Sequence, residues 1–173
     1  MRLACLALCL LAFGTPPRIA AGQSFPIDES VEGSWLDPNT PGQGFLMDYF
    51  PGVNKLFVAW FTFDPKAVSG NPNALRWMTA TLDVTFDHAS GDVFTTTGGA
   101  FNAALPVPVD TSIGSMSIHF AGCDQASLDF DLKPPDDVSG TISIVSLGSV
   151  VDPVVACQPT MDPLNHIKAF AKP

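Results

Sequence analysis

Apolar and polar residues alternate along most of this chain, which is the pattern of β-strands with one buried face. The alternation is cleanest around Met116, Ile118 and Phe120, which are separated by Ser117 and His119. Clusters of Gly, Pro, Asn and Asp interrupt the pattern at fairly regular intervals and indicate turns. The pattern predicts eight strands, at residues 32–36, 44–50, 55–63, 75–84, 93–97, 115–120, 127–132 and 139–147.

The order of these elements predicts an all-β fold. Short strands joined by turns, with no amphipathic helix pattern of useful length, favour a single antiparallel meander of about eight strands closed into a barrel. Closure also removes the exposed strand edges of an open sheet. A two-sheet β-sandwich is the alternative that the same pattern permits. In the C-terminal tail, only residues 163–171 could form a helical turn or two.

Residues 55–63 depart from the alternation because both faces of this predicted strand are apolar. One face carries Leu56, Val58 and Trp60, and the other carries Phe57, Ala59, Phe61 and Phe63. Such a strand is either covered on both faces or presents an apolar outer surface. A second layer of the chain or a protein partner is therefore expected to shield it.

The connections are predicted from turn-forming residues. Residues 23–30 form a polar N-terminal arm, residues 37–43 form a loop rich in Pro and Gly, and residues 87–92 form a turn. Residues 101–110 carry two prolines, which exclude a central strand. We expect this segment to cross one end of the barrel as a loop.

Four motifs in the chain carry a family resemblance. They are Gly33-Ser34-Trp35-Leu36-Asp37-Pro38 with Gly42-Gln43-Gly44-Phe45, then Trp60-Phe61-Thr62-Phe63-Asp64, then Trp77, and Phe120-Ala121-Gly122-Cys123-Asp124-Gln125-Ala126. Together they resemble a family of secreted bacterial domains with a G-x-W-x-[ND]-P…G-x-G-[FW] opening and a W-[FY]-T-[YF]-[DN] strand. The resemblance covers residues 32–147, except that the connection at 71–77 departs from the shorter Gly-x-Pro-x-Trp turn of that family. It implies a secreted β-domain and no particular activity.

The Gly-x-Trp on the first strand also resembles, more distantly, the opening of avidins and lipocalins. In such calycin-like barrels the tryptophan points into the core and closes one end. The resemblance therefore assigns Trp35 to the structural core, and Phe45 on the following strand is assigned there with it.

Residues 1–22 have the features of a secretory signal peptide that is removed. Arg2 supplies the positive start, residues 3–13 an apolar segment, and residues 19–21 a small-residue cleavage site. The apolar segment is too short to span a bilayer, and no later stretch approaches about 20 apolar residues. We expect a barrel domain at 23–150, a C-terminal tail at 151–173, and a secreted or periplasmic protein.

Charge narrows the range of partners. The whole chain carries 8 basic and 17 acidic residues, and loss of Arg2 and Arg18 leaves 6 against 17, a net charge of −11. This balance argues against nucleic acid or an anionic membrane surface as a partner.

Two cysteines remain once Cys5 and Cys9 leave with the signal peptide. In an oxidising compartment, Cys123 and Cys157 are predicted to form one disulfide. This bond would tether the C-terminal tail to one end of the barrel.

No catalytic or cofactor motif occurs in the sequence. There is no Gly-x-Ser-x-Gly nucleophile elbow, and the three histidines lack the short spacings of a zinc site. Asp129 and Asp131 alternate with apolar residues, as the wet face of a strand would place them. No catalytic residue, cofactor or metal ligand is therefore assigned.

The aromatic side chains are the more informative candidates. A small barrel either fills its interior with its own side chains or holds one apolar ligand. If one end stays open, the loop at 37–43 is expected to border it. The candidate ligand-binding residues are Gln43, Tyr49, Trp60 and Trp77.

Three functions remain open at this point. The first is a non-catalytic barrel that binds a small apolar ligand or an extracellular protein, the second a structural or accessory domain, and the third a hydrolase. A cavity of several hundred Å³ would favour ligand binding. An exposed apolar patch outside residues 55–63 would favour a protein partner, and a buried group with a shifted pKa in a cleft would favour an enzyme.

Overall fold

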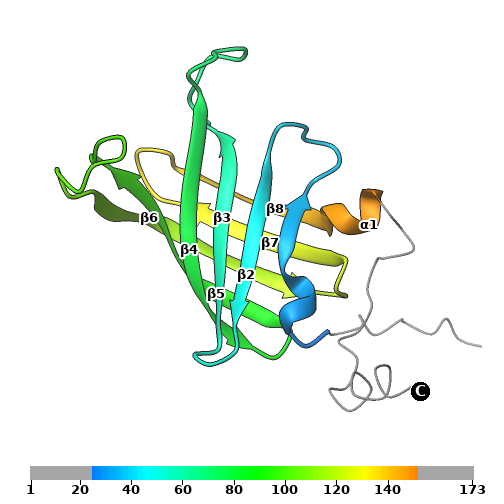
Figure 1. Cartoon of the computed structure of the whole chain (residues 1–173). Helices are drawn as coiled ribbons and strands as arrows, with labels where there is room; N and C mark the ends of the chain where they lie inside the picture. The colour runs from blue at the N-terminus through cyan, green and yellow to red at the C-terminus, as the bar shows by residue number, and fades with distance from the viewer. Residues whose placement is uncertain (1–24, 152–173) are drawn as a thin grey trace, which may run out of the picture.

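The computed structural model describes residues 25–151, which form a closed antiparallel β-barrel whose strands neighbour one another in sequence order. The predicted eight-stranded meander barrel is therefore confirmed, and the sandwich alternative is not adopted. Two short helices, η1 (Glu29–Val31) and α1 (Leu147–Val151), flank the strands (Figure 1). The strands are β1 (Gly33–Leu36), β2 (Gly44–Phe50), β3 (Lys55–Phe63), β4 (Leu75–Thr85), β5 (His88–Thr97), β6 (Val109–Phe120), β7 (Gln125–Leu132) and β8 (Val138–Ser146).

Three local predictions are wrong. The chain reverses at Phe86 and Asp87, so residues 88–92 belong to β5 and not to a turn. Phe86 has a φ of 56°, a conformation that a bulky residue rarely adopts. A phenylalanine is therefore not recognised as a turn residue from the sequence. β6 begins at Val109, earlier than expected, and residues 147–151 form α1 where the last strand and the tail were expected.

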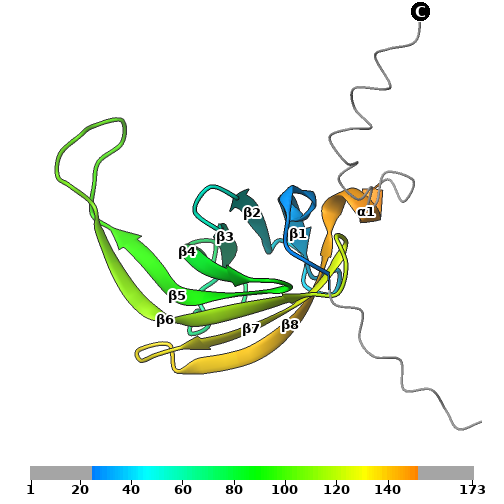
Figure 2. The same ribbon diagram turned by 90° about the horizontal axis from the view of Figure 1, so that it is seen from below.

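The outer part of the β5–β6 hairpin is an arm that projects away from the barrel (Figure 2). β5 pairs with β4 only as far as Phe94, and residues 95–97 pair with β6 alone. The register of β5 against β6 shifts between Val93 and Phe94, next to Gly114, and such a bulge bends a strand. The prediction that residues 101–110 cross the end of the barrel is therefore wrong.

The end of the barrel next to η1 is filled by side chains. Trp35 is 1% exposed, and its indole Nε1 donates a hydrogen bond to the carbonyl oxygen of Val31 at 2.8 Å. Its ring meets Phe120 edge-on, with the ring centroids 5.4 Å apart. The N–H of Ile27 donates to the carbonyl oxygen of Phe86 at 2.7 Å, which fastens the N-terminal arm under this end. Trp35 is thus buried in the core at the closed end of the barrel.

Closure of the barrel depends on a short seam between β1 and β8. β1 pairs with β8 only at Val145 and Ser146. The chain then leaves the sheet, because Pro38 has no N–H for a strand ladder and the Asp37 carboxylate accepts the N–H of Asn39 at 2.9 Å to form a turn. Within residues 25–151, the N-terminal part of β8 is therefore paired with β7 alone.

Cys123 lies in the turn between β6 and β7 and is buried. Its expected partner, Cys157, lies outside the described residues, as do the signal peptide and most of the C-terminal tail. The disulfide and the division of the chain into signal, barrel and tail stay predictions.

Candidate ligand-binding site

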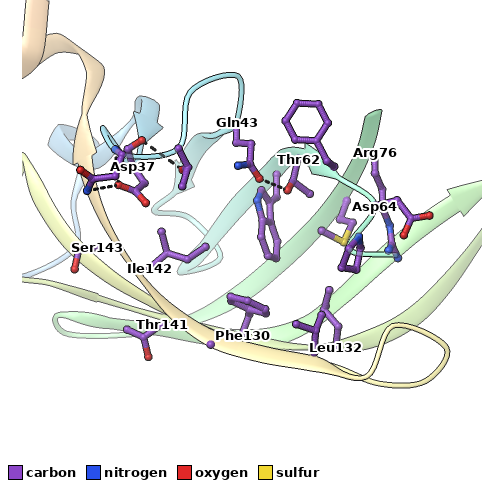
Figure 3. Close-up of a pocket in the computed structure, with 18 residues that line it drawn as sticks. Asp37, Gln43, Thr62, Asp64, Arg76, Phe130, Leu132, Thr141, Ile142 and Ser143 are labelled. Atoms are coloured by element: carbon purple, nitrogen blue, oxygen red, sulfur yellow. Dashed lines mark hydrogen bonds between the residues drawn. The ribbon is translucent and has the colours of Figure 1, made fainter. Parts of the chain in front are cut away.

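A cavity of about 700 Å³ opens at the end of the barrel away from η1. The loop at 37–43 and the adjoining ends of β3 and β4 form one wall, and β7 and β8 form the other (Figure 3). Its volume lies within the range of sites that hold small molecules, about 300 to 1,000 Å³. The apolar part of the lining consists of Trp60, Phe63, Pro65, Met78, Phe130, Leu132, Val138 and Ile142.

Trp60 separates this cavity from the packed core. Its ring stacks on that of Phe45 with centroids 5.4 Å apart, and it meets Phe130 edge-on at 5.2 Å. Phe45 is buried in the core cluster together with Leu56 and Val58, which share the inner face of β3 with Trp60. The aromatic residues therefore fill one half of the barrel and line the cavity in the other half.

Polar groups surround the mouth of the cavity. The Thr62 hydroxyl donates to Oε1 of Gln43 at 2.5 Å, on the wall opposite Phe130 and Leu132 (Figure 3). The carboxylates of Asp37 and Asp64 lie toward opposite sides of the mouth in the same view. This arrangement, an apolar interior with a polar rim, can bury an apolar group and orient it at the surface.

Two basic residues connect the walls on the side of Asp64. Arg76 Nη1 lies 2.6 Å from Asp136 Oδ2, with side chains that are 19% and 9% exposed. Lys66 Nζ donates to the carbonyl oxygen of Pro135, next in sequence to Asp136. These contacts join β4 and the β3–β4 connection to the β7–β8 turn. They cross the side of the barrel from which the arm departs. Arg76 is the only basic residue of the cavity lining, so no other cation of the lining balances Asp37 and Asp64.

The structure brings two of the four candidate residues to the cavity. Gln43 and Trp60 line it, whereas Tyr49 lies on β2 toward the closed end, where its hydroxyl donates to Oδ1 of Asn54 at 3.0 Å. Trp77 lies on the outer face of β4 and is 51% exposed, because the neighbouring Met78 takes the inner face. The expectation that Trp77 reaches the lumen is therefore wrong.

Several lining residues were not recognised from the sequence. Phe130 and Leu132 stand out as the apolar face of an alternating strand, but which end of the barrel they line follows from strand register. The ion pair of Arg76 with Asp136 joins residues 60 positions apart and has no local signal.

The outer face of β2, β3 and β4 carries a second feature, which we term the outer patch: Leu46, Phe61, Phe63, Leu75 and Trp77. Phe63, at the end of β3, also borders the cavity. Phe61 lies opposite Trp77 and Phe63 opposite Leu75 in adjacent strands, and all five side chains are at least two-fifths exposed. Soluble proteins rarely leave large contiguous patches of this kind uncovered. On the apolar second face of residues 55–63, Phe61 and Phe63 are thus exposed, whereas Ala59 is buried and Phe57 is half-buried.

No protein-family model, curated protein or solved structure matches the chain. The likeness to secreted bacterial β-domains therefore stays an expectation. Within residues 25–151, no helix has the length and apolar character needed to cross a bilayer. The same residues place no three His, Cys, Asp or Glu side chains where they could hold a metal ion together.

Proposed function

We propose that this protein is a secreted, non-catalytic barrel that binds an apolar ligand in the cavity beside the loop at 37–43. The observation that carries this proposal is the cavity itself, about 700 Å³ in volume, with an apolar interior and a polar rim. Burial of roughly 250 Å² of apolar ligand surface would contribute about 6 kcal/mol before the costs of association, at about 25 cal/mol per Å². The costs of association offset part of this contribution, so the polar groups of the rim must add to the affinity.

Ligand binding is expected to change the fluorescence of Trp60 and to raise the unfolding midpoint by mass action. The probes are uncharged, so that the carboxylates of the mouth do not repel them: medium-chain alcohols and N-phenyl-1-naphthylamine, followed by tryptophan fluorescence and by thermal unfolding. Trp60→Phe should lose most of the fluorescence response, whereas the matched variant Trp77→Phe should keep it, because Trp77 lies on the outer face. Ile142→Trp should narrow the cavity and weaken the thermal shift. If no probe moves either signal, or if Ile142→Trp binds as well as the parent protein, the proposal fails.

The outer patch supports a second candidate function, the binding of an extracellular protein. Its large exposed aromatic residues are of the kind enriched at the centres of protein interfaces. A photo-crosslinking benzoylphenylalanine in place of Trp77 is expected to capture a defined partner from the exported fraction. The same amino acid in place of Ser117, on the polar outer face of β6, should not. Equal capture at both positions would mean that the outer patch is not an interface.

A further inference from the structure

The edge of β8 that borders the cavity has no strand partner among residues 25–151. β8 pairs with β7 along its length, but it meets β1 only at Val145 and Ser146. The N–H of Ser146 donates to the carbonyl oxygen of Asp124 at 3.0 Å, so the even-numbered residues of β8 face β7. The odd-numbered residues must direct their N–H and C=O groups to the opposite side. Three of them lie beyond the reach of β1: Ser139, Thr141 and Ser143.

These free backbone groups lie directly on the wall of the cavity. Gly140, Thr141, Ile142 and Ser143 all belong to its lining. Ser139, Thr141 and Ser143 are exposed residues, so this edge is accessible to another chain. Gly140 has no side chain to fill the space; a Cβ there would lie 3.2 Å from the ring of Phe130. An unpaired edge of this kind is a template for a further strand.

A strand hydrogen-bonded to this edge would lie about 4.8 Å from β8 and would turn every second side chain toward the barrel interior. Those side chains would enter the cavity between Trp60, Met78 and Phe130. The side chains between them would face solvent, continuing the row of Ser139, Thr141 and Ser143. Strand addition of this type takes affinity from main-chain hydrogen bonds and specificity from the pockets for alternate side chains.

The charge of the mouth defines the peptide further. Asp37 and Asp64 lie toward its two sides, and the only basic residue of the lining, Arg76, is paired with Asp136. The chain as a whole carries a net charge of −9. A complementary partner therefore carries Lys or Arg beside its apolar residues.

From these observations we infer that the natural ligand of the cavity is an extended peptide segment, apolar at alternate positions and basic at its ends, which pairs with β8 at Ser139, Thr141 and Ser143. The inference rests on the proposed function, because the cavity must accept the apolar side chains. It also explains why the chain leaves the sheet at Asp37 and Pro38: a longer β1 would cover the edge.

The test uses the purified protein and a displayed library of random peptides of about ten residues, long enough to span one strand. We expect enriched peptides to share alternate apolar residues with flanking Lys or Arg. Synthetic versions are then methylated at one backbone nitrogen at a time, and their affinities are measured by fluorescence polarisation. Because only every second N–H of an added strand faces β8, methylation should weaken binding with a period of two residues.

A matched pair of protein variants tests the same contact from the other side. Thr141→Pro removes one N–H from the free edge and leaves the β7 ladder intact, a position where an edge strand tolerates proline. Thr141→Val keeps that N–H, and both variants lose the hydroxyl that donates to Asp129. Affinity should fall roughly tenfold in Thr141→Pro and change less than about twofold in Thr141→Val. If Thr141→Pro does not fold, the methylation series decides alone.

The outcomes separate the two proposals. If the selection enriches no peptides with alternate apolar residues, the strand-addition inference is overturned. It is also overturned if methylation of the enriched peptides shows no two-residue period. If the apolar probes still bind in that case, the proposed function stands. A stable dimer that excludes every peptide would assign the β8 edge to a second copy of the chain and would also overturn the inference.

Discussion

Replacing Trp35 with alanine is expected to lower the free energy of unfolding by about 3 to 5 kcal/mol, the range for truncating a large buried aromatic residue. Trp35 is 1% exposed and joins η1 to the barrel through the Nε1 hydrogen bond to Val31 and the edge-on contact with Phe120. Truncation opens a cavity at the closed end and leaves the Val31 carbonyl oxygen without its indole donor. Urea unfolding should show the loss directly, and the thermal midpoint should fall by on the order of 10 °C or more.

Two further variants separate the contribution of the buried ring from that of the indole hydrogen bond. Trp77→Ala removes a tryptophan side chain that is half exposed on the outer face, and it should lower the free energy of unfolding much less than Trp35→Ala does. Trp35→Phe keeps most of the ring but not the indole donor, and should cost about 1 to 2 kcal/mol. A Trp35→Ala protein with an unchanged midpoint would show that the closed end is not held by this residue. Because the cavity lies at the other end, Trp35→Ala should act on folding and not on ligand affinity in the folded protein.

Most of the strands were predictable because they follow from a local pattern; the exceptions are residues 88–92 and 109–114, where a turn and a loop were expected and strand is found. Alternation along residues 127–132 needs only the period of two, and it places Leu128 and Leu132 in the core, as the structure does. The inner face of a strand is harder to assign when both faces are apolar. Trp60 and Trp77 look alike in the sequence, since each has an apolar neighbour. Only the pairing of β3 and β4 shows that Trp60 lines the cavity and Trp77 the outer patch.

The site itself depends on contacts that a single sequence does not encode locally. The Pro38 turn indicates that the first strand ends at Leu36, but not that this uncovers the edge of β8. That consequence requires the register of β1 against β8. The bulge at Gly114 is similar, because the irregularity exists only in the pairing of β6 with β5. Sequence patterns thus predict the elements, whereas the openings between them follow from pairing.

Gly114→Ala is expected to destabilise the protein by about 2 to 4 kcal/mol, from steric overlap together with backbone strain. Gly114 has a φ of 159°, and a Cβ added there would lie 2.2 Å from the carbonyl oxygen of Asp131 and 2.8 Å from the Cα of Leu132. Both atoms belong to the backbone of β7, which cannot move aside without breaking its pairing with β6. The methyl group must therefore push the two strands apart at the bulge.

The matched control is Gly52→Ala, in the turn between β2 and β3, where an added Cβ meets nothing within 4 Å. That variant should be neutral or slightly stabilising, because alanine restricts the unfolded chain. Urea unfolding of both variants gives the comparison, and loss of the arm's protection in hydrogen exchange should accompany the destabilisation at Gly114. The bulge is also where the arm turns away from β4 and leaves the side of the cavity to the Arg76–Asp136 pair. If Gly114→Ala and Gly52→Ala unfold at the same urea concentration, β6 does not approach Asp131 as closely as the structure shows. The departure of the arm from β4 would then need a cause other than the bulge.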